Sequence, residues 1–283
     1  MTHEPHRTAS LNMSPDASPP PTGQGPVPPL PGAIGLSNLR PYDWEAADGV
    51  CGGSPHMHLA CTEAYVVTGG RGAVQTLTPN GYRETPLEPG ALVWFTPGTV
   101  HRMVEGDGLS VTVLMENAGL PEAGDAVFTF PPSVLADPAA YARAATLPSP
   151  ATPGATGPEA LARAARRRRD LAVEGYLVLR EALRRSDPKP LLAFHQAAAR
   201  LVAHKAATWQ ERWRTGALAA AQRTGDHLRA LAAADPAHLA EAQVATTGPS
   251  LRDGYGMCGR RDEYALEGAT LPYGYRTSKR PRE

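Results

Sequence analysis

The stretch that decides the fold contains HMHLACTEAYVVTGG (residues 56–70) and, after a short interval, EPGALVWFTPGTVHRM (residues 88–103). In an extended strand, side chains two positions apart leave from the same face, so His56 and His58 point the same way. A carboxylate and a third imidazole follow at the edges of two apolar runs. Three imidazoles and one carboxylate suit iron, manganese, nickel, cobalt, copper or zinc as a divalent ion. We therefore expect a metal site made of His56, His58, Glu63 and His101.

The spacing of these residues resembles the two motifs of the cupin superfamily. The first motif is His-x-His, four residues, Glu, six residues and Gly, and it recurs here as His56, His58, Glu63 and Gly70. The second motif has a Gly, a Pro-x-Gly element and a His, and it recurs as Gly90, Gly98 and His101. The sequence departs from the family where Val50 replaces a glycine, Thr96 a proline and Glu105 the closing asparagine.

The resemblance covers roughly residues 35 to 117 and implies a fold and a chemistry for that part of the chain. It implies a small antiparallel β jelly-roll (cupin) barrel, which we place at residues 33–120. The metal would act there as a Lewis acid, and a redox-active ion would also activate dioxygen. We expect Tyr65 or Glu105 to assist proton transfer as a catalytic residue.

The residue pattern by itself also predicts short strands and turns in this region. Asn80-Gly81 is a two-residue hairpin signal between two strand-like runs. Alternation of apolar and polar residues over 109–116 predicts a half-buried strand. The same alternation places four further side chains on the inner face beside the ligands: Ala60, Tyr65, Val67 and Met103. Arg102 neighbours a ligand, so we expect it to face outward.

The rest of the chain divides by composition into further segments. A proline-rich tail that we expect to be disordered occupies residues 1–32. After the barrel come a linker with a short helix (residues 121–157), an α-helical region (158–246) and a Gly/Tyr/Arg-rich tail (247–283). In the helical region one apolar stripe contains Ala172, Tyr176, Leu179 and Leu183. Arg166–Arg169 occupies more than one turn, so its four cations cannot share one face, and we read it as a solvated collar.

Charge is distributed unevenly although the net charge is zero. Residues 1–130 carry 5 basic and 13 acidic groups, whereas residues 131–283 carry 23 and 15. Such a split is compatible with a nucleic-acid partner, but the basic groups are dispersed among alanines and leucines. We therefore expect the basic half to pack against the acidic half, within the chain or across a homodimer, and we expect no nucleic-acid partner.

Two classes of function follow from these observations. The first is a metal-dependent enzyme acting on a small, oxygen-rich and weakly charged metabolite, with a dioxygenase-like reaction ahead of isomerisation. Only three cations lie between residues 41 and 130, which argues against a sugar-phosphate substrate. The second class is a non-catalytic metabolite sensor with a basic helical output region. Three cysteines make no disulfide framework, and no signal peptide or membrane span is evident, so we expect a cytoplasmic protein.

Overall fold

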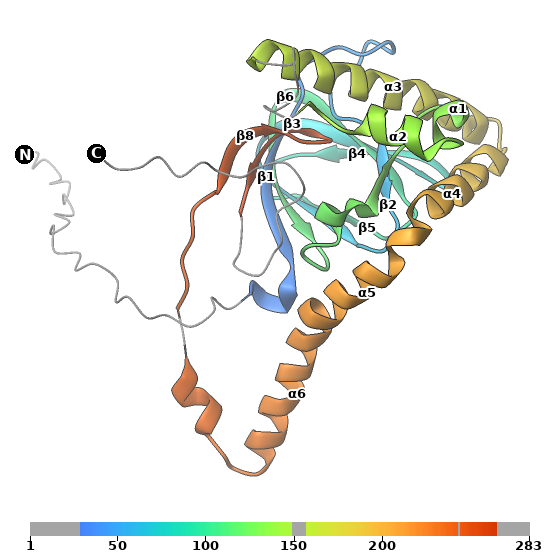
Figure 1. Ribbon diagram of the computed structural model, residues 1–283. Helices are drawn as coiled ribbons and strands as arrows, with labels where there is room; N and C mark the ends of the chain where they lie inside the picture. Colours follow the sequence, from blue (N-terminus) through green and yellow to red (C-terminus); the bar gives the residue numbers. More distant parts are fainter. Residues whose placement is uncertain (1–28, 149–156, 243, 265–283) are drawn as a thin grey trace, which may run out of the picture.

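The computed structural model describes residues 29–148, 157–242 and 244–264. Within these residues a single antiparallel sheet is covered on one side by helices, and one long helix projects away from it (Figure 1). The predicted N-terminal tail lies outside the described residues as far as position 28, and so do Tyr273, Tyr275 and Arg276 of the C-terminal tail.

The strands are β1 (Gly35–Pro41), β2 (His56–His58), β3 (Glu63–Thr78), β4 (Gly81–Leu87), β5 (Leu92–Phe95), β6 (Val100–Met115), β7 (Ala126–Phe128), β8 (Leu251–Tyr255) and β9 (Gly259–Glu263). The α-helices are α1 (Pro132–Leu135), α2 (Pro138–Ala145), α3 (Pro158–Arg184), α4 (Lys189–Val202), α5 (Ala206–Trp213) and α6 (Ala219–Ala232). Short 3-10 or π turns are η1 (Pro31–Ala33), η2 (Pro121–Asp125), η3 (Ala203–Lys205), η4 (Arg214–Leu218) and η5 (Ala237–Glu241).

The long strands β3 and β6 form the centre of the sheet and pair with each other along most of their length. The main path runs β4-β3-β6-β1-β9-β8, while β5 pairs with β3 and β2 pairs with both β6 and β7. The prediction of a mainly β part followed by a helical part is thereby confirmed. Closure of the strands into a jelly-roll barrel stays a prediction.

Local sequence signals explain the central strands. The residues at 109, 111, 113 and 115 are all buried, which confirms the predicted half-buried strand. The predicted hairpin between β3 and β4 also forms, but its turn is Pro79-Asn80, because Thr78 pairs directly with Gly81. The turn is therefore one residue earlier than the Asn-Gly signal indicated.

Helix α3 packs closely on the sheet through its predicted apolar stripe, all four members of which are buried. A Cβ atom at Gly175 would come within 2.0 Å of the Thr129 carbonyl oxygen, so only glycine permits this approach. The Thr129 hydroxyl donates to the Ala172 carbonyl at 2.8 Å. Helix α3 is thus held closely against the residue that follows β7.

The segments predicted as linker and C-terminal tail contribute to the sheet. Strand β7, from within the predicted linker, pairs with β2. Strand β9, from within the predicted tail, pairs with β1. The linker prediction is wrong here because Phe128 and Phe130 are buried in the core, and burial of large aromatic rings outweighs the Pro- and Gly-rich composition around them.

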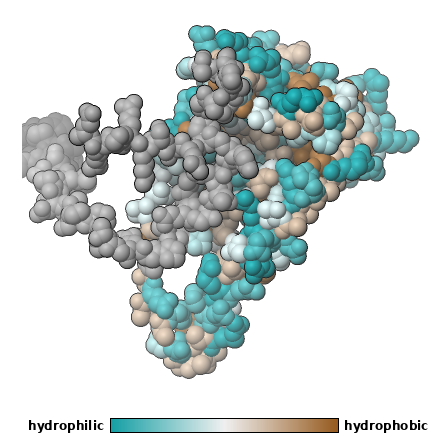
Figure 2. All heavy atoms as spheres, viewed as in Figure 1, coloured by the Kyte–Doolittle hydropathy of each residue, from teal (hydrophilic) through white to brown (hydrophobic). Residues whose placement is uncertain are grey.

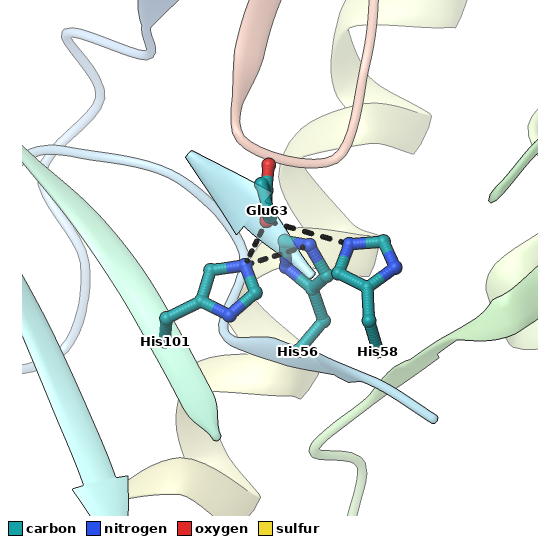
Figure 3. A group of neighbouring side chains, drawn as sticks. All are labelled: His56, His58, Glu63 and His101. Atoms are coloured by element: carbon teal, nitrogen blue, oxygen red, sulfur yellow. Dashed lines mark hydrogen bonds and ion pairs between the residues drawn. The ribbon is translucent and has the colours of Figure 1, made fainter. Parts of the chain in front are cut away.

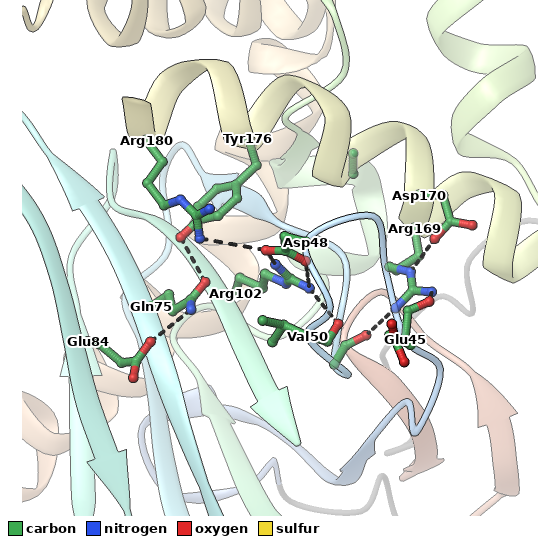
Figure 4. Close-up of polar contacts among 12 residues, drawn as sticks. Glu45, Asp48, Val50, Gln75, Glu84, Arg102, Arg169, Asp170, Tyr176 and Arg180 are labelled. Carbon is green, nitrogen blue, oxygen red and sulfur yellow. Dashed lines mark hydrogen bonds and ion pairs between the residues drawn. The ribbon is translucent and has the colours of Figure 1, made fainter. Parts of the chain in front are cut away.

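Arg102 faces away from the predicted ligands, but it is fully buried rather than exposed. Its guanidinium donates to both carboxylate oxygens of Asp48, at 2.7 and 3.3 Å, underneath α3 (Figure 4). The helix covers the outer face of β6 at this point, so facing outward from the sheet does not mean facing water. Arg169 is buried as well and donates to the Glu45 carbonyl, while Arg166 is exposed, so the predicted solvated collar is wrong for half of the run.

Helices α4, α5 and α6 continue one another through the turns η3 and η4. The first part is anchored, because Leu191, Phe194 and Leu201 are buried, whereas α6 has no buried residue. The surface of the molecule seen in Figure 2 is dominated by hydrophilic residues with small hydrophobic patches among them. Among the helices of the described residues, none combines the length and the apolar character that crossing a membrane requires.

Candidate metal centre

The four predicted ligands come together although they lie on three strands. His56 and His58 occupy the two ends of β2, Glu63 begins β3, and His101 is the second residue of β6. The pairing of β2 with β6 sets His56 directly opposite His101. All four side chains are buried (Figure 3), and we refer to them as the metal group.

The ligand atoms of the metal group all lie within 4.8 Å of one another. Nε2 of His101 is 3.0 Å from Oε2 of Glu63 and 3.1 Å from Nε2 of His56. Nε2 of His58 is 3.4 Å from the same carboxylate oxygen. The three Nε2 atoms and one carboxylate oxygen therefore converge on a single point.

The outward nitrogen of each ring is held by an acceptor. Nδ1 of His56 lies 2.9 Å from the Ser54 carbonyl oxygen, and Nδ1 of His101 lies 3.2 Å from the Thr99 carbonyl oxygen. Nδ1 of His58 lies 3.0 Å from Oδ2 of Asp125. A carbonyl or carboxylate oxygen can only accept, so each Nδ1 donates its proton outward. When a ring is neutral, its Nε2 lone pair is therefore left facing the centre, which is the arrangement found around metal-binding histidines.

The atoms that the metal group turns toward its centre suit a bound cation better than contacts with one another. Oε2 of Glu63 is buried, and when the rings are neutral it has no donor with hydrogen-bond geometry among the described residues. Buried acceptors that face one another without donors cost free energy unless a cation neutralises them. Three nitrogens and one carboxylate oxygen are a donor set for a first-row divalent ion. This group is able to bind a metal ion.

The charge states follow from burial and from the neighbours. Burial and the other two histidines hold the pKa of His56 well below its ordinary value, so its ring is neutral. Burial raises the pKa of Glu63, but His101 and His58 outweigh it and the net pKa is low, so the carboxylate is ionised. Burial lowers the pKa of His58, but Asp125 and Glu63 outweigh it and raise the pKa to about 9. A metal ion must therefore displace a proton from His58.

Tyr65 lies two residues after Glu63, on the same face of β3, and is fully buried. Its hydroxyl has no partner with hydrogen-bond geometry among the described residues. Burial, and next the charge of Glu63, raise the pKa of Tyr65 well above its ordinary value, so the phenol keeps its proton. Glu105, the other predicted catalytic residue, accepts a hydrogen bond from the Leu109 amide at 3.1 Å in the bend of β6.

Three of the four predicted wall residues are buried as expected: Tyr65, Val67 and Met103. Ala60 is exposed, and that prediction was wrong. The alternation stops because β2 ends at His58, and the next two amides, of Leu59 and Ala60, turn to donate to Oδ1 of Asp125 at 3.1 and 2.7 Å.

Two residues next to the metal group were missed by the sequence reasoning. Asp125 is completely buried and fixes His58, but it stands in a segment that composition indicated as linker. Cys258 is buried, and its Sγ is 3.9 Å from Nδ1 of His56. For Asp125 the sequence offers one signal, the apolar run at 126–128 that follows it. No local sequence pattern marks Cys258.

No protein-family model and no curated protein matches the chain. Among solved structures, it aligns with the WlaRB TDP-quinovose 3,4-ketoisomerase from Campylobacter jejuni at 13% identity, covering 29% of this chain and 60% of that one, with a TM-score of 0.25. The sugar 3,4-ketoisomerase QdtA from Thermoanaerobacterium thermosaccharolyticum, in complex with TDP, aligns at 13% identity over 32% and 64%, with a TM-score of 0.28. A structure of the DMSP lyases RdDddP and RnDddQII aligns at 22% identity over 34% and 43%, with a TM-score of 0.26. The chain spans less than two thirds of each of these chains, and similarities at this level say nothing about its function.

Proposed function

We propose that this protein is a cupin-type, metal-dependent enzyme whose divalent transition metal is held by His56, His58, Glu63 and His101. The observation that carries the proposal is the convergence of three Nε2 atoms on one buried carboxylate oxygen, with Nδ1 of each ring directed outward. Each ring is fixed in that tautomer by an acceptor on its far side. A group that served only packing would not need all three imidazoles oriented in this way.

The bound metal would supply Lewis acidity and, if redox-active, a site for dioxygen chemistry. The residues of the chain provide the rest. Tyr65 keeps its proton in the site and is the better proton donor, because the carboxylate of Glu105 is already engaged by the Leu109 amide. The apolar side chains of Val67 and Met103, on the strands that carry Glu63 and His101, are buried. A small, oxygen-rich and weakly charged substrate suits such a site, with an oxidation of the dioxygenase type ahead of an isomerisation.

A metabolite sensor is the second candidate, and α6 is the observation that favours it. This helix has no buried residue and projects from the sheet. It therefore offers a surface for a partner whose binding would depend on whether the site holds its ligand. The expected homodimer is one such partner and stays a prediction.

The test begins with metal analysis of the purified protein and of two variants, His56→Ala and His101→Ala. We expect about one metal ion per chain in the wild type and little in either variant, because each removes a ligand from a four-ligand set. Full occupancy in both variants would refute the site. Oxygen uptake and product analysis against a panel of small metabolites then separate the classes: turnover supports the enzyme, and binding without turnover supports the sensor.

A further inference from the structure

The outer face of the sheet carries an apolar patch that crosses β5, β3, β6 and β1. Four side chains follow one another across these strands, each directly opposite the next: Trp94, Ala64, Leu114 and Leu36. Directly opposite residues of an antiparallel ladder lie on the same face of the sheet, so the four form one row. The next row on this face contains another directly opposite pair, Leu92 and Val66. We call these six side chains the sheet patch.

The sheet patch faces water. Trp94 is 65% exposed and Leu92 is 55% exposed, and the other four side chains are partly exposed. Their neighbours along the strands, such as Tyr65 and Val113, point to the opposite face and are buried in the core. The open face of an antiparallel sheet normally carries polar residues, so a continuous apolar area here marks an interaction site. A large aromatic anchor such as Trp94 is typical of the centre of an interface.

Helix α6 presents a second apolar surface without a partner among the described residues. Leu228 is 62% exposed and Leu231 is 52% exposed, and because they stand three positions apart they share one face of the helix. Thr224 and Ala221 continue this face toward the start of α6, so the face carries no charge. A helix in a folded protein gains most of its stability by packing such a face, and α6 has no buried residue. The contact that would stabilise α6 is therefore absent within one chain.

The two surfaces stand in complementary charge surroundings. Residues 33–120, which include the whole sheet patch, carry 4 basic and 9 acidic groups, whereas α5 to α6 (residues 206–232) carry 4 and 2. Exposed Glu88 and Glu116 stand near the margin of the patch, on the turn before β5 and just after β6. The acidic sheet and the basic helices therefore attract each other between copies, and a chain without net charge meets a second copy without overall repulsion.

We propose that α6 of a second copy of this chain covers the sheet patch, with Trp94 of one copy packed against the Leu228–Leu231 face of the other. Each copy offers both surfaces, so a twofold axis makes the same contact twice and leaves neither surface open. Within one chain the two surfaces do not cover each other, because Trp94 and Leu228 are both more than half exposed. Helix α6 projects away from its own sheet in Figure 1, which leaves it free to contact a neighbour. The inference goes beyond the proposed function and does not depend on a bound metal.

Sedimentation equilibrium of the full-length protein tests the inference with one variant in each surface, Trp94→Glu and Leu228→Glu. We expect the wild type to dimerise at micromolar concentration and each variant to have a dissociation constant about tenfold higher or more, because a carboxylate would be buried against an apolar surface. Leu192→Glu adds the same charge at an exposed leucine of α4 and should dimerise like the wild type. Thermal denaturation checks that each variant folds, and Leu92→Glu repeats the test of the sheet patch if Trp94→Glu does not.

An equimolar mixture of Trp94→Glu and Leu228→Glu tests which surfaces meet. A mixed dimer keeps one unaltered contact between helix and patch, so the mixture should dimerise more tightly than either variant alone. Weakening in one variant only would mean that patch packs on patch or helix on helix, and a mixture no tighter than the separate variants would also overturn the arrangement. A monomeric wild type would overturn the inference as a whole, and residues 1–28 would then be tested by deletion as the cover of the patch.

Discussion

Two buried polar clusters flank β6, and they differ in how their groups are paired. On the inner face, the metal group turns three Nε2 atoms and an ionised carboxylate toward one another. On the outer face, beneath α3, a set that we call the arginine network alternates donors and acceptors: Arg102, Asp48, Arg180, Tyr176 and Gln75 (Figure 4). The adjacent residues His101 and Arg102 thus belong to clusters of opposite character.

The difference in pairing distinguishes a structural cluster from a binding site. Asp48 receives two hydrogen bonds from Arg102 and lies 3.6 Å from Arg180, so its charge is compensated within the protein. Tyr176 donates to Gln75 at 3.0 Å, and Gln75 in turn donates to Glu84 at 2.8 Å. When its rings are neutral, the metal group has an excess of acceptors, which a cation from outside can satisfy. Both clusters are buried and polar, so burial alone would not have told them apart.

The largest effect on stability is expected from Arg102→Met. The substitution keeps an apolar stem but leaves the half-buried Asp48 with only Arg180 nearby. Breaking a fully buried pair costs about 3–5 kcal/mol, so we expect the lower end of that range here. We expect a loss of about 3 kcal/mol in the free energy of unfolding, measured by denaturant titration, with metal content unchanged. Arg83→Met, at an exposed position of β4, is the control and should change the stability by less than about 0.5 kcal/mol. Equal losses in the free energy of unfolding for the two variants would show that the pairing of Arg102 with Asp48 does not stabilise the fold.

Asp125→Asn is expected to have the next largest effect, on metal affinity rather than on folding. Asp125 holds His58 by its ring nitrogen, and loss of such a partner lowers metal affinity by about tenfold to a hundredfold. Isothermal titration with Zn²⁺ measures the change. Glu122→Gln is the control, because that carboxylate lies in the same turn but caps the Gly119 amide at 2.8 Å. A weaker affinity in both variants would point to distortion of the turn.

The metal group could be predicted from the sequence because its four residues lie close together in the sequence, at the ends of β2, β3 and β6. Strand alternation and the cupin resemblance together located His56, His58, Glu63 and His101. Asp125 and Cys258 could not be found in this way, because their positions depend on pairings between distant segments. Cys258 is 202 residues from His56 and reaches it only because β9 pairs with β1.

The arginine network could not be predicted either, for a different reason. Alternation along β6 correctly placed Arg102 on the face opposite His101, but it carries no information about what covers that face. Helix α3 supplies Tyr176 and Arg180 from a segment that was expected to pack against the acidic half, within the chain or across a homodimer, but no particular face of the sheet was assigned to it. The direction of a side chain is a local property, whereas its burial depends on tertiary packing.

A smaller effect is expected from Tyr176→Phe. The substitution removes the hydroxyl that donates to Oε1 of Gln75 in the core and leaves the ring in place. Loss of one buried hydrogen bond costs about 1 kcal/mol, since the free acceptor is not solvated. Denaturant titration measures this, and Tyr82→Phe, whose partly exposed hydroxyl lies near Glu84, should cost less. An equal cost for both would mean that the arginine network gains nothing from burial.

The smallest effect is expected from pH, acting through Asp48. Burial raises the pKa of this carboxyl, but the hydrogen bonds and charge of Arg102 outweigh burial and bring the net pKa below the ordinary value of 3.8. Because the folded-state pKa is the lower one, the stabilisation is fully present above pH 3.8 and is lost as the pH falls through the folded-state pKa. The loss is smaller than in Arg102→Met because a neutral Asp48 still accepts a hydrogen bond.

Asp48→Asn isolates this contribution from that of the other carboxyl groups. The variant has no charge to lose at this position, so its melting temperature should fall less steeply than that of the wild type as the pH drops below about 4. Both proteins are compared by thermal denaturation without metal, so that protonation of the metal group affects them alike. Parallel curves in this range would show that the charge of Asp48 contributes nothing to stability, and the arginine network would then depend on hydrogen bonding alone.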